Sequence, residues 1–122
     1  MIYAMKRTTI RNHLDFLMPR DAPHICTDCV IVKFKPAKFA NDPRYGLIVP
    51  KKMFKLAVHR NRAKRLLRDW IAYNEKLMLD KYDYIFISRG TILGCSRDFG
   101  RHEVYRALKK VIRMENPNAN KK

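Results

Sequence analysis

Residues 44–70 read RYGLIVPKKMFKLAVHRNRAKRLLRDW, and the order of apolar and basic positions in this stretch decides the fold. Residues 45–49 predict a short strand that stops at Pro50, because proline cannot donate a hydrogen bond to a sheet. From about residue 56 to residue 73 the pattern fits a helix, in which side chains are spaced about 100° apart. Its apolar side would hold Leu56, His59, Ala63, Leu66, Leu67 and Trp70. We therefore expect a strand followed by an amphipathic helix.

The outer side of this helix is predicted to be cationic. It would carry Asn61, Arg62, Arg65, Arg68 and Asp69, with Arg60 and Lys64 on a flank, and no acid occurs between Lys51 and Arg68. Like charges three or four residues apart destabilise a helix unless a polyanion neutralises them. Arginine also binds phosphate through a planar fork and stacks on bases. The pattern therefore favours a surface for nucleic acid over an ordinary solvated face.

Composition supports a folded, strongly basic protein. The chain has 122 residues, a formal net charge of +16 and 47% hydrophobic residues. This length fits one domain over residues 1–122, ordered at about 8–114 and with a polar, frayed tail at 116–122. The apolar fraction excludes a disordered basic tail, and such a charge usually meets an anionic partner. No apolar run of about 18 residues and no secretory signal is present, so we expect a cytoplasmic protein without a membrane span.

The segments before the quoted stretch predict a helix and then strands. Thr8 or Thr9 is expected to cap a first helix, ended by Pro19, with an apolar stripe at Ile10, Leu14 and Leu17. Alternation over residues 30–35 predicts a strand. Its apolar face would consist of Val30, Val32 and Phe34. A weaker edge strand is possible between Arg20 and Ile25.

The segments after it predict one more strand and a last helix. Residues 82–88 are rich in aromatic and β-branched side chains, which are typical of a strand. Ser96 or Asp98 is expected to cap a helix whose stripe is Val104, Leu108, Val111 and Ile112. The prediction is an α+β fold in the order α-β-β-β-α-β-α, with three helices on a small sheet of about four strands.

Few residues point to chemistry by the protein itself. Asp80 and Asp83 are the only close acidic pair in the middle of the expected fold, and the four histidines lie on four different elements. Metal-dependent phosphodiester cleavage needs several converging carboxylates. The odd number of cysteines, Cys26, Cys29 and Cys95, favours reduced structural thiols over a disulfide framework or a metal site. We predict no catalytic residue and no metal ligand in this chain.

The quoted stretch resembles the signature of the bacterial ribonuclease P protein component. In that family a strand of the form R-x-G-L/F leads to a double lysine, and a helix with the pattern R-N-R-x-K-R-x-x-R follows. Residues 44–52, Ala57 and residues 60–68 fit this pattern. The resemblance implies a left-handed crossover from the strand through the basic helix to the strand at residues 82–88. Such connections are right-handed in about 98% of proteins, so general rules alone would misplace the helix.

The resemblance also implies a function: helping a catalytic RNA to remove the 5′ leader of precursor tRNA. The protein would bind no cofactor itself, the Mg²⁺ would belong to the RNA, and no membrane or stable protein partner is expected. The implied contacts to the RNA are Lys51, Lys52, Arg60, Asn61, Arg62, Lys64, Arg65 and Arg68. A cleft for the leader is expected between the sheet and the basic helix. Its candidates are Phe16, from a family-like Asp-Phe pair, together with Val32 and Phe34.

The sequence is also compatible with other functions. A non-catalytic ribosomal or ribosome-assembly protein would share the charge, the size and the α+β core, and a membrane-surface protein is a third interpretation. For single residues, core packing is expected of Trp70, Tyr82 and Tyr84 rather than base stacking. His59 fits a buried imidazole and an RNA contact equally well.

Overall fold

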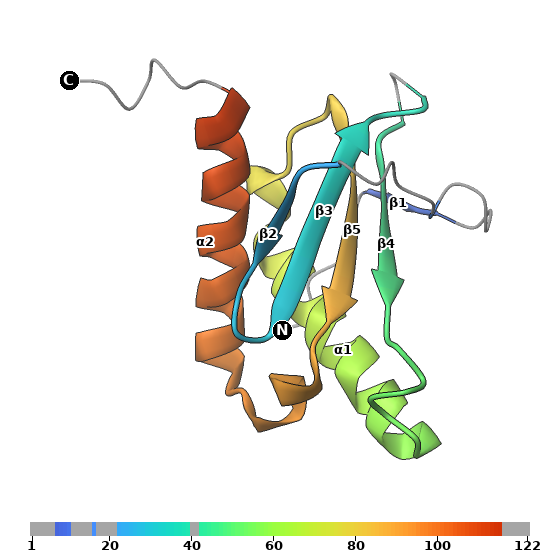
Figure 1. The fold of residues 1–122 in the computed structure, drawn as a ribbon. Coiled ribbons are helices and arrows are strands. Elements are labelled where there is room, and N and C mark those ends of the chain that lie inside the picture. Colours follow the sequence, from blue (N-terminus) through green and yellow to red (C-terminus); the bar gives the residue numbers. More distant parts are fainter. Residues whose placement is uncertain (1–6, 11–15, 17–21, 40–41, 116–122) are drawn as a thin grey trace.

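Five strands and two α-helices make up the part of the chain that the computed structural model describes, residues 7–10, 16, 22–39 and 42–115 (Figure 1). The strands are β1 (Thr8–Thr9), β2 (His24–Cys26), β3 (Val30–Pro36), β4 (Arg44–Ile48) and β5 (Tyr82–Ser88). The helices are α1 (Ala57–Tyr73) and α2 (Arg97–Glu115), with short 3₁₀ turns η2 (Glu75–Leu77) and η3 (Gly90–Gly94). The α+β class and the elements from β3 onward are confirmed.

The strands form one mixed sheet in the order β1-β4-β5-β3-β2. β3 is antiparallel to both β2 and β5, whereas β4 is parallel to β5 and to β1. The basic helix α1 connects the parallel neighbours β4 and β5. In Figure 1 both strands point downward, α1 passes behind the sheet and β5 lies to the left of β4. The crossover is therefore left-handed, the rare hand that the resemblance implies.

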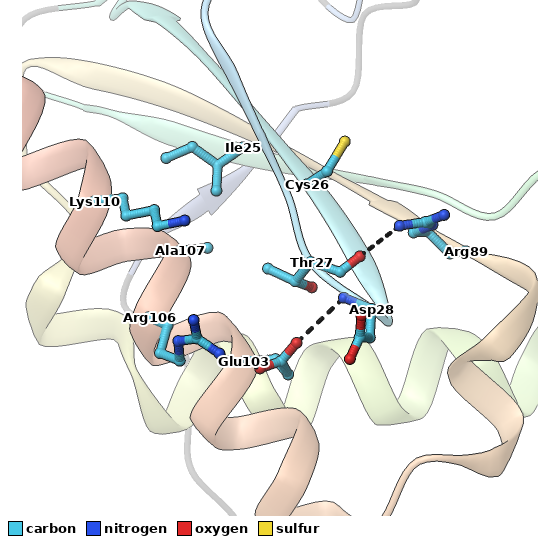
Figure 2. A pocket seen from close by; sticks show the side chains of 9 residues that line it. All are labelled: Ile25, Cys26, Thr27, Asp28, Arg89, Glu103, Arg106, Ala107 and Lys110. Carbon is cyan, nitrogen blue, oxygen red and sulfur yellow. Dashed lines mark hydrogen bonds and ion pairs between the residues drawn. The ribbon is translucent and has the colours of Figure 1, made fainter.

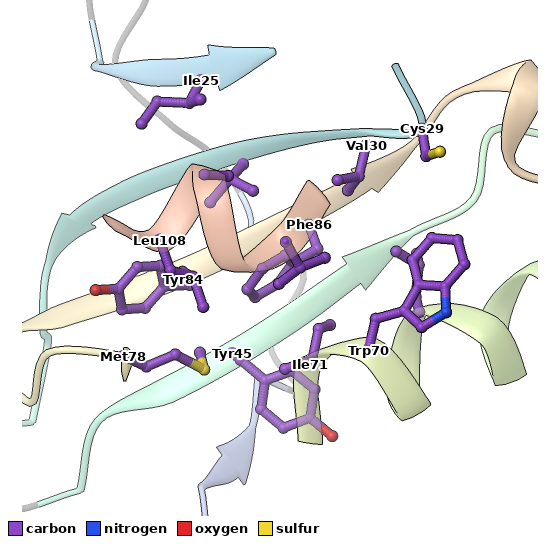
Figure 3. Close-up of a cluster of buried hydrophobic side chains, with 14 of the residues drawn as sticks. Ile25, Cys29, Val30, Tyr45, Trp70, Ile71, Met78, Tyr84, Phe86 and Leu108 are labelled. Carbon is purple, nitrogen blue, oxygen red and sulfur yellow. The ribbon is translucent and has the colours of Figure 1, made fainter. Parts of the chain in front are cut away.

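The hydrophobic core lies between the two helices and one face of the sheet (Figure 3). From α1 it takes Ala63, Leu67, Trp70 and Ile71, and from α2 it takes Val104, Ala107, Leu108 and Val111. The sheet contributes Val30, Val32, Phe34, Tyr84 and Phe86, all nearly or fully inaccessible to solvent. The predicted apolar faces of both helices and of β3 therefore meet in one core.

Trp70 and Tyr84 have no exposed surface, which confirms that they are packing residues. The Trp70 ring lies so close to Gly100 of α2 that a Cβ there would come within 2.0 Å of the indole. Only a residue without a side chain allows the two helices to approach in this way. Gly100 therefore fixes how closely the start of α2 packs on α1.

The start of the chain differs from the prediction. Thr8 and Thr9 do not cap a helix, because they pair in parallel with Arg44 and Tyr45 of β4 as β1. Residues 11–15 and 17–21 of the predicted first helix, and the predicted tail 116–122, lie outside the described residues. Ser96 caps the last helix as expected: its Oγ accepts a hydrogen bond from the Phe99 amide at 3.1 Å.

Two of the three cysteines are joined, contrary to the expected reduced thiols. A disulfide links Cys29 to Cys95, while Cys26 is free and exposed. The fold brings the pair together because the β2–β3 turn lies against the end of β5 and η3. There the Arg89 amide donates to the Cys29 carbonyl oxygen at 2.9 Å, and Thr91 Oγ1 donates to the Asp28 carbonyl oxygen.

Among the described residues, neither helix combines the length and the hydrophobicity that a membrane-spanning helix needs.

Candidate nucleic-acid interface

The outer side of α1 is an exposed cationic face. We define this cationic face as Asn61, Arg62, Lys64, Arg65 and Arg68, all of them exposed. Within the described part of the chain, none of its four basic side chains has a hydrogen bond or an ion pair. The predicted residues Lys51 and Lys52 are also exposed, in the turn between β4 and α1. The opposite side of the helix is fixed in the core, so these charges project from a rigid support.

The one acid on the outer side of α1 is already neutralised. Asp69 accepts two hydrogen bonds from Arg101 of α2, at 3.1 Å from Nε and 3.0 Å from Nη2. The Arg101 guanidinium also stacks over the Tyr73 ring, 4.2 Å from its centroid. Such a two-point pair leaves little of the carboxylate charge to offset the neighbouring arginines. It also joins the two helices.

Arg60 differs from the other predicted RNA contacts. Its Nη1 donates to the carbonyl oxygens of Phe54 and Lys55, at 2.7 and 3.0 Å, and the side chain is half-buried. Arg60 therefore holds the loop before α1 in place. The residues expected on the apolar side at the start of this helix, Leu56 and His59, are exposed. They are exposed because the first turn of α1 extends beyond the edge of the sheet, as Figure 1 shows.

The sheet has a second face, turned away from the helices, on which Phe16 lies. A Cβ added at Gly46 of β4 would come 2.4 Å from Phe16 Cε1 and 2.9 Å from Cζ, so the ring rests on the strand backbone. Gly46 pairs with Ile85, and Lys33 pairs with Ile85 from the other side. We call Phe16, Ile31, Lys33, Ile48 and Ile87 the open sheet face; all are half-buried.

The structure has no room for the predicted leader cleft between the sheet and α1. Between the sheet and α1, core side chains such as Leu67, Trp70 and Phe86 fill the space. Val32 and Phe34 point into that core, with 0% and 4% of their surface exposed, which argues against a role in binding the leader. The same alternation places Lys33 on the open sheet face. The alternation of residues 30–35 was visible in the sequence, but it did not show which face of the sheet the helices cover.

Arg7 is a buried cation that sequence analysis missed. Its guanidinium donates to the carbonyl oxygens of Leu79 at 2.9 Å and of Tyr82, and its amide donates to Glu75 Oε2 at 2.7 Å. Burial lowers the pKa of the Arg7 guanidinium from its ordinary value. Nearby acidic groups raise this pKa, but their effect is smaller than that of burial. These bonds tie the residue before β1 to η2, to Leu79 and to β5. β1 itself pairs with β4.

A separate hollow lies between the β2–β3 turn and α2 (Figure 2). Glu103, which is 4% exposed, accepts a hydrogen bond from the Asp28 amide at 3.2 Å and pairs with Arg106 at 3.4 Å. Arg89 donates to the Thr27 carbonyl oxygen at 2.8 Å. Glu103 therefore holds the turn against α2, and Arg89 holds it against the end of β5.

Comparison with known proteins agrees with this arrangement. A family model described as Ribonuclease P matches residues 5–114. The chain belongs to the Ribonuclease P family. Curated members of the family share parts of the sequence. The ribonuclease P protein component of Pseudomonas entomophila is 49% identical over 47 residues, which are 38% of this chain and 35% of that protein. That of Vibrio campbellii is 36% identical over 69 residues, 57% of this chain and 54% of that protein.

These alignments span about a third to a half of the relatives' length. Solved structures of the family cover more of the chain. A mutant of the Staphylococcus aureus RNase P protein has a TM-score of 0.72 at 23% identity, covering 84% of this chain and 86% of that one. The Thermotoga maritima RNase P protein has a TM-score of 0.70 at 23% identity, covering 85% and 97%. At this identity the match establishes the common fold.

Proposed function

We propose that this chain is the protein subunit of a bacterial ribonuclease P, in which an RNA carries out catalysis. The observation that carries the proposal is the cationic face of α1, whose four basic side chains have no partner within the described residues. Folding such a helix costs free energy through like-charge repulsion unless an anion binds. Family membership supports the ribonuclease P RNA as that anion.

The cationic face would dock on folded RNA through phosphates. Arginine forks on a rigid helix suit backbone phosphate groups, which give affinity with little sequence information. Lys51 and Lys52 extend the same positive surface beyond the start of the helix. Arg60 contributes by holding the loop that carries these lysines, rather than by offering a free guanidinium.

The open sheet face would hold the 5′ leader of precursor tRNA. Phe16 offers an aromatic ring and Lys33 a cation, and the half-buried Ile31, Ile48 and Ile87 form the next row of the same face. Single-stranded nucleic acid binds to surfaces that combine stacking with positive charge, and such binding tolerates varied sequences. The docking surface and the leader surface then lie on different sides of the sheet, which allows one protein to contact RNA and substrate together.

The Mg²⁺ ions of the reaction would belong to the RNA. In this proposal the protein raises substrate affinity and reduces repulsion between phosphates. Less Mg²⁺ is then required to bring RNA and substrate together. The chain itself supplies binding and positioning rather than a catalytic group.

The test is cleavage of a precursor tRNA by a bacterial ribonuclease P RNA, with and without the protein, across Mg²⁺ concentrations. We expect strong stimulation at low Mg²⁺ that fades as Mg²⁺ rises. The double variant Arg65→Ala/Arg68→Ala should lose most of the stimulation. The double variant Lys110→Ala/Arg113→Ala, which removes two exposed cations from the C-terminal half of α2, serves as the control of equal charge change. Tight RNA binding without stimulation at any Mg²⁺ concentration would favour the ribosomal alternative.

A further inference from the structure

A shallow hollow of about 390 Å³ lies where α1 passes the start of α2. Its lining consists of Arg62, Arg65, Leu66 and Asp69 from α1 and Arg97 from α2. Arg62 and Arg65 belong to the sequence pattern of the basic helix, whereas Arg97 lies in a different element and outside that pattern. The fold therefore adds a third arginine that the linear motif does not contain.

The positive charge of the hollow is not offset by its one acidic residue. Asp69 is its only acid, and both carboxylate oxygens are hydrogen-bonded to Arg101. Across the ranges that the structure describes, Arg62, Arg65 and Arg97 have no ion pair and no hydrogen bond from their side chains. Three positive charges without an acid of their own repel one another, and an anion between them removes that repulsion.

Arg97 is held in this position by rigid contacts on its own helix. Ser96 caps the helix immediately before it, and Gly100 packs against the buried Trp70 ring. Arg101 adds the two hydrogen bonds to Asp69. The start of α2 is thus capped by Ser96 and fixed on α1 through two contacts, at Gly100 and at Arg101. Its backbone cannot shift away to relieve the repulsion between the arginines.

The position of Arg97 gives no benefit to the stability of its helix. A cation in the first turn faces the positive end of the helix dipole, which is unfavourable, and Arg97 is exposed. Its side chain makes no compensating contact within the described residues. Arg97 is thus unfavourable for its own helix and lies beside Arg62 and Arg65. Such a cluster of arginines is suited to binding an anion.

We propose that Arg97 joins Arg62 and Arg65 in a seat for one phosphodiester group of folded RNA. The inference rests on the proposed RNA-docking function and extends it from α1 to α2. A guanidinium donates two parallel hydrogen bonds to phosphate oxygens, so arginines from two directions can surround one phosphate. Leu66 closes the floor of the seat with an apolar contact.

The test measures binding of the full chain to ribonuclease P RNA and to an unrelated folded RNA, over a range of salt concentrations. The variants are Arg97→Ala, Arg65→Ala, the double variant, and Arg113→Ala as the control on the same helix. Loss of one phosphate contact should lower the slope of log affinity against log salt by about 0.7–0.9. We expect this loss for Arg97→Ala with both RNAs and not for Arg113→Ala. Because Arg65 and Arg97 would share one phosphate, the double variant should lose less than the sum of the single losses.

The outcomes separate the two proposals. If the wild-type chain binds RNA and Arg97→Ala keeps the wild-type slope, the seat is wrong while the function of α1 stands. Additive losses in the double variant would also overturn the shared seat. If the wild-type chain binds neither RNA, the proposed function and the seat fall together. Urea unfolding of each variant checks that a changed slope does not come from a destabilised fold.

Discussion

The ring of Phe16 lies on the backbone of Gly46, and a Cβ at Gly46 would come 2.4 Å from Phe16 Cε1. This contact explains why the strand before the double lysine carries a glycine: any side chain would displace the ring. The contact also connects Phe16 to the glycine of the R-x-G-L/F pattern. The open sheet face is therefore built from the same strand that leads into the basic helix.

Gly46→Ala should weaken leader binding more than it weakens the fold. The atoms that the new methyl group would meet are the far end of a half-buried side chain, which can swing away. We expect a loss of stability of no more than about 1.5 kcal/mol. The affinity advantage of a precursor tRNA over the same tRNA without its leader should fall. Binding of both tRNAs to the RNA–protein complex measures that advantage.

The control for this prediction is Phe16→Ala. In that background, Gly46→Ala should have no further effect on leader binding, because the displaced ring is already absent. An additional loss in the double variant would contradict the displacement mechanism.

Gly100→Ala should destabilise the protein strongly. A Cβ at Gly100 would lie 2.0 Å from the Trp70 ring, which has no exposed surface and no room to move. Overpacking of this kind costs about 1–3 kcal/mol, and relief requires α2 to move away from α1. Urea unfolding monitored by Trp70 fluorescence measures the loss. The chain offers a matched control in Gly94→Ala, because a Cβ at Gly94 would meet nothing within 4 Å.

Arg60→Ala and Arg65→Ala should have different effects, although both remove one arginine from α1. Loss of the Arg60 hydrogen bonds to Phe54 and Lys55 should lower the free energy of unfolding by about 1–2 kcal/mol. Arg65→Ala should leave stability within about 0.5 kcal/mol of wild type. It should instead lower the salt dependence of RNA binding. Equal effects of both variants on stability would show that the loop does not depend on Arg60.

Tyr82 should ionise at unusually high pH. A hydrogen bond to Glu115, together with burial, raises the pKa of Tyr82 to about 12, from an ordinary value of 10.0. A raised pKa favours the neutral phenol in the folded state. The resulting stabilisation is complete below pH 10 and is lost as pH rises towards 12. Ultraviolet titration of tyrosinate, with Tyr82→Phe to assign the transition, follows it directly.

Glu115→Gln should return the pKa of Tyr82 towards its ordinary value, since Glu115 is the largest cause of the shift. The pKa of Glu115 itself should shift in the opposite direction, below its ordinary value. Hydrogen bonds from Lys81 and Tyr82 lower the pKa of its carboxyl group, so its stabilising effect is lost as pH falls. Unchanged Tyr82 titration in Glu115→Gln would exclude this pairing.

Elements with strong local periodicity could be predicted from the sequence. The helix at residues 56–73 follows from the spacing of its apolar residues, and the strand at 82–88 follows from its aromatic and β-branched composition. Ser96 is a cap because a hydroxyl at that position meets the amide of Phe99. The identity of the cationic face also follows from the sequence, since a buried apolar stripe fixes which side of a helix is outside.

Features set by distant contacts could not be predicted in this way. Thr8 and Thr9 form a strand only because β4 lies beside them, and Cys29 meets Cys95 only through the fold. Alternation separated Val32 from Lys33 but gave no information on which face the helices cover. Arg60 carries the same charge as Arg65, and only the path of the preceding loop makes it a structural residue.

The crossover has a consequence for how the chain folds. β4 and β5 are neighbours in the sheet, but α1 separates them in the sequence, so β5 can pair with β4 only when the connecting segment has folded back. This connecting segment contains α1, whose positive charges repel one another. Closing this non-local pairing is slow in any chain, and repulsion within the connecting helix slows it further. The refolding rate should therefore rise with ionic strength, so the surface suited to binding RNA also sets the speed at which the sheet is completed.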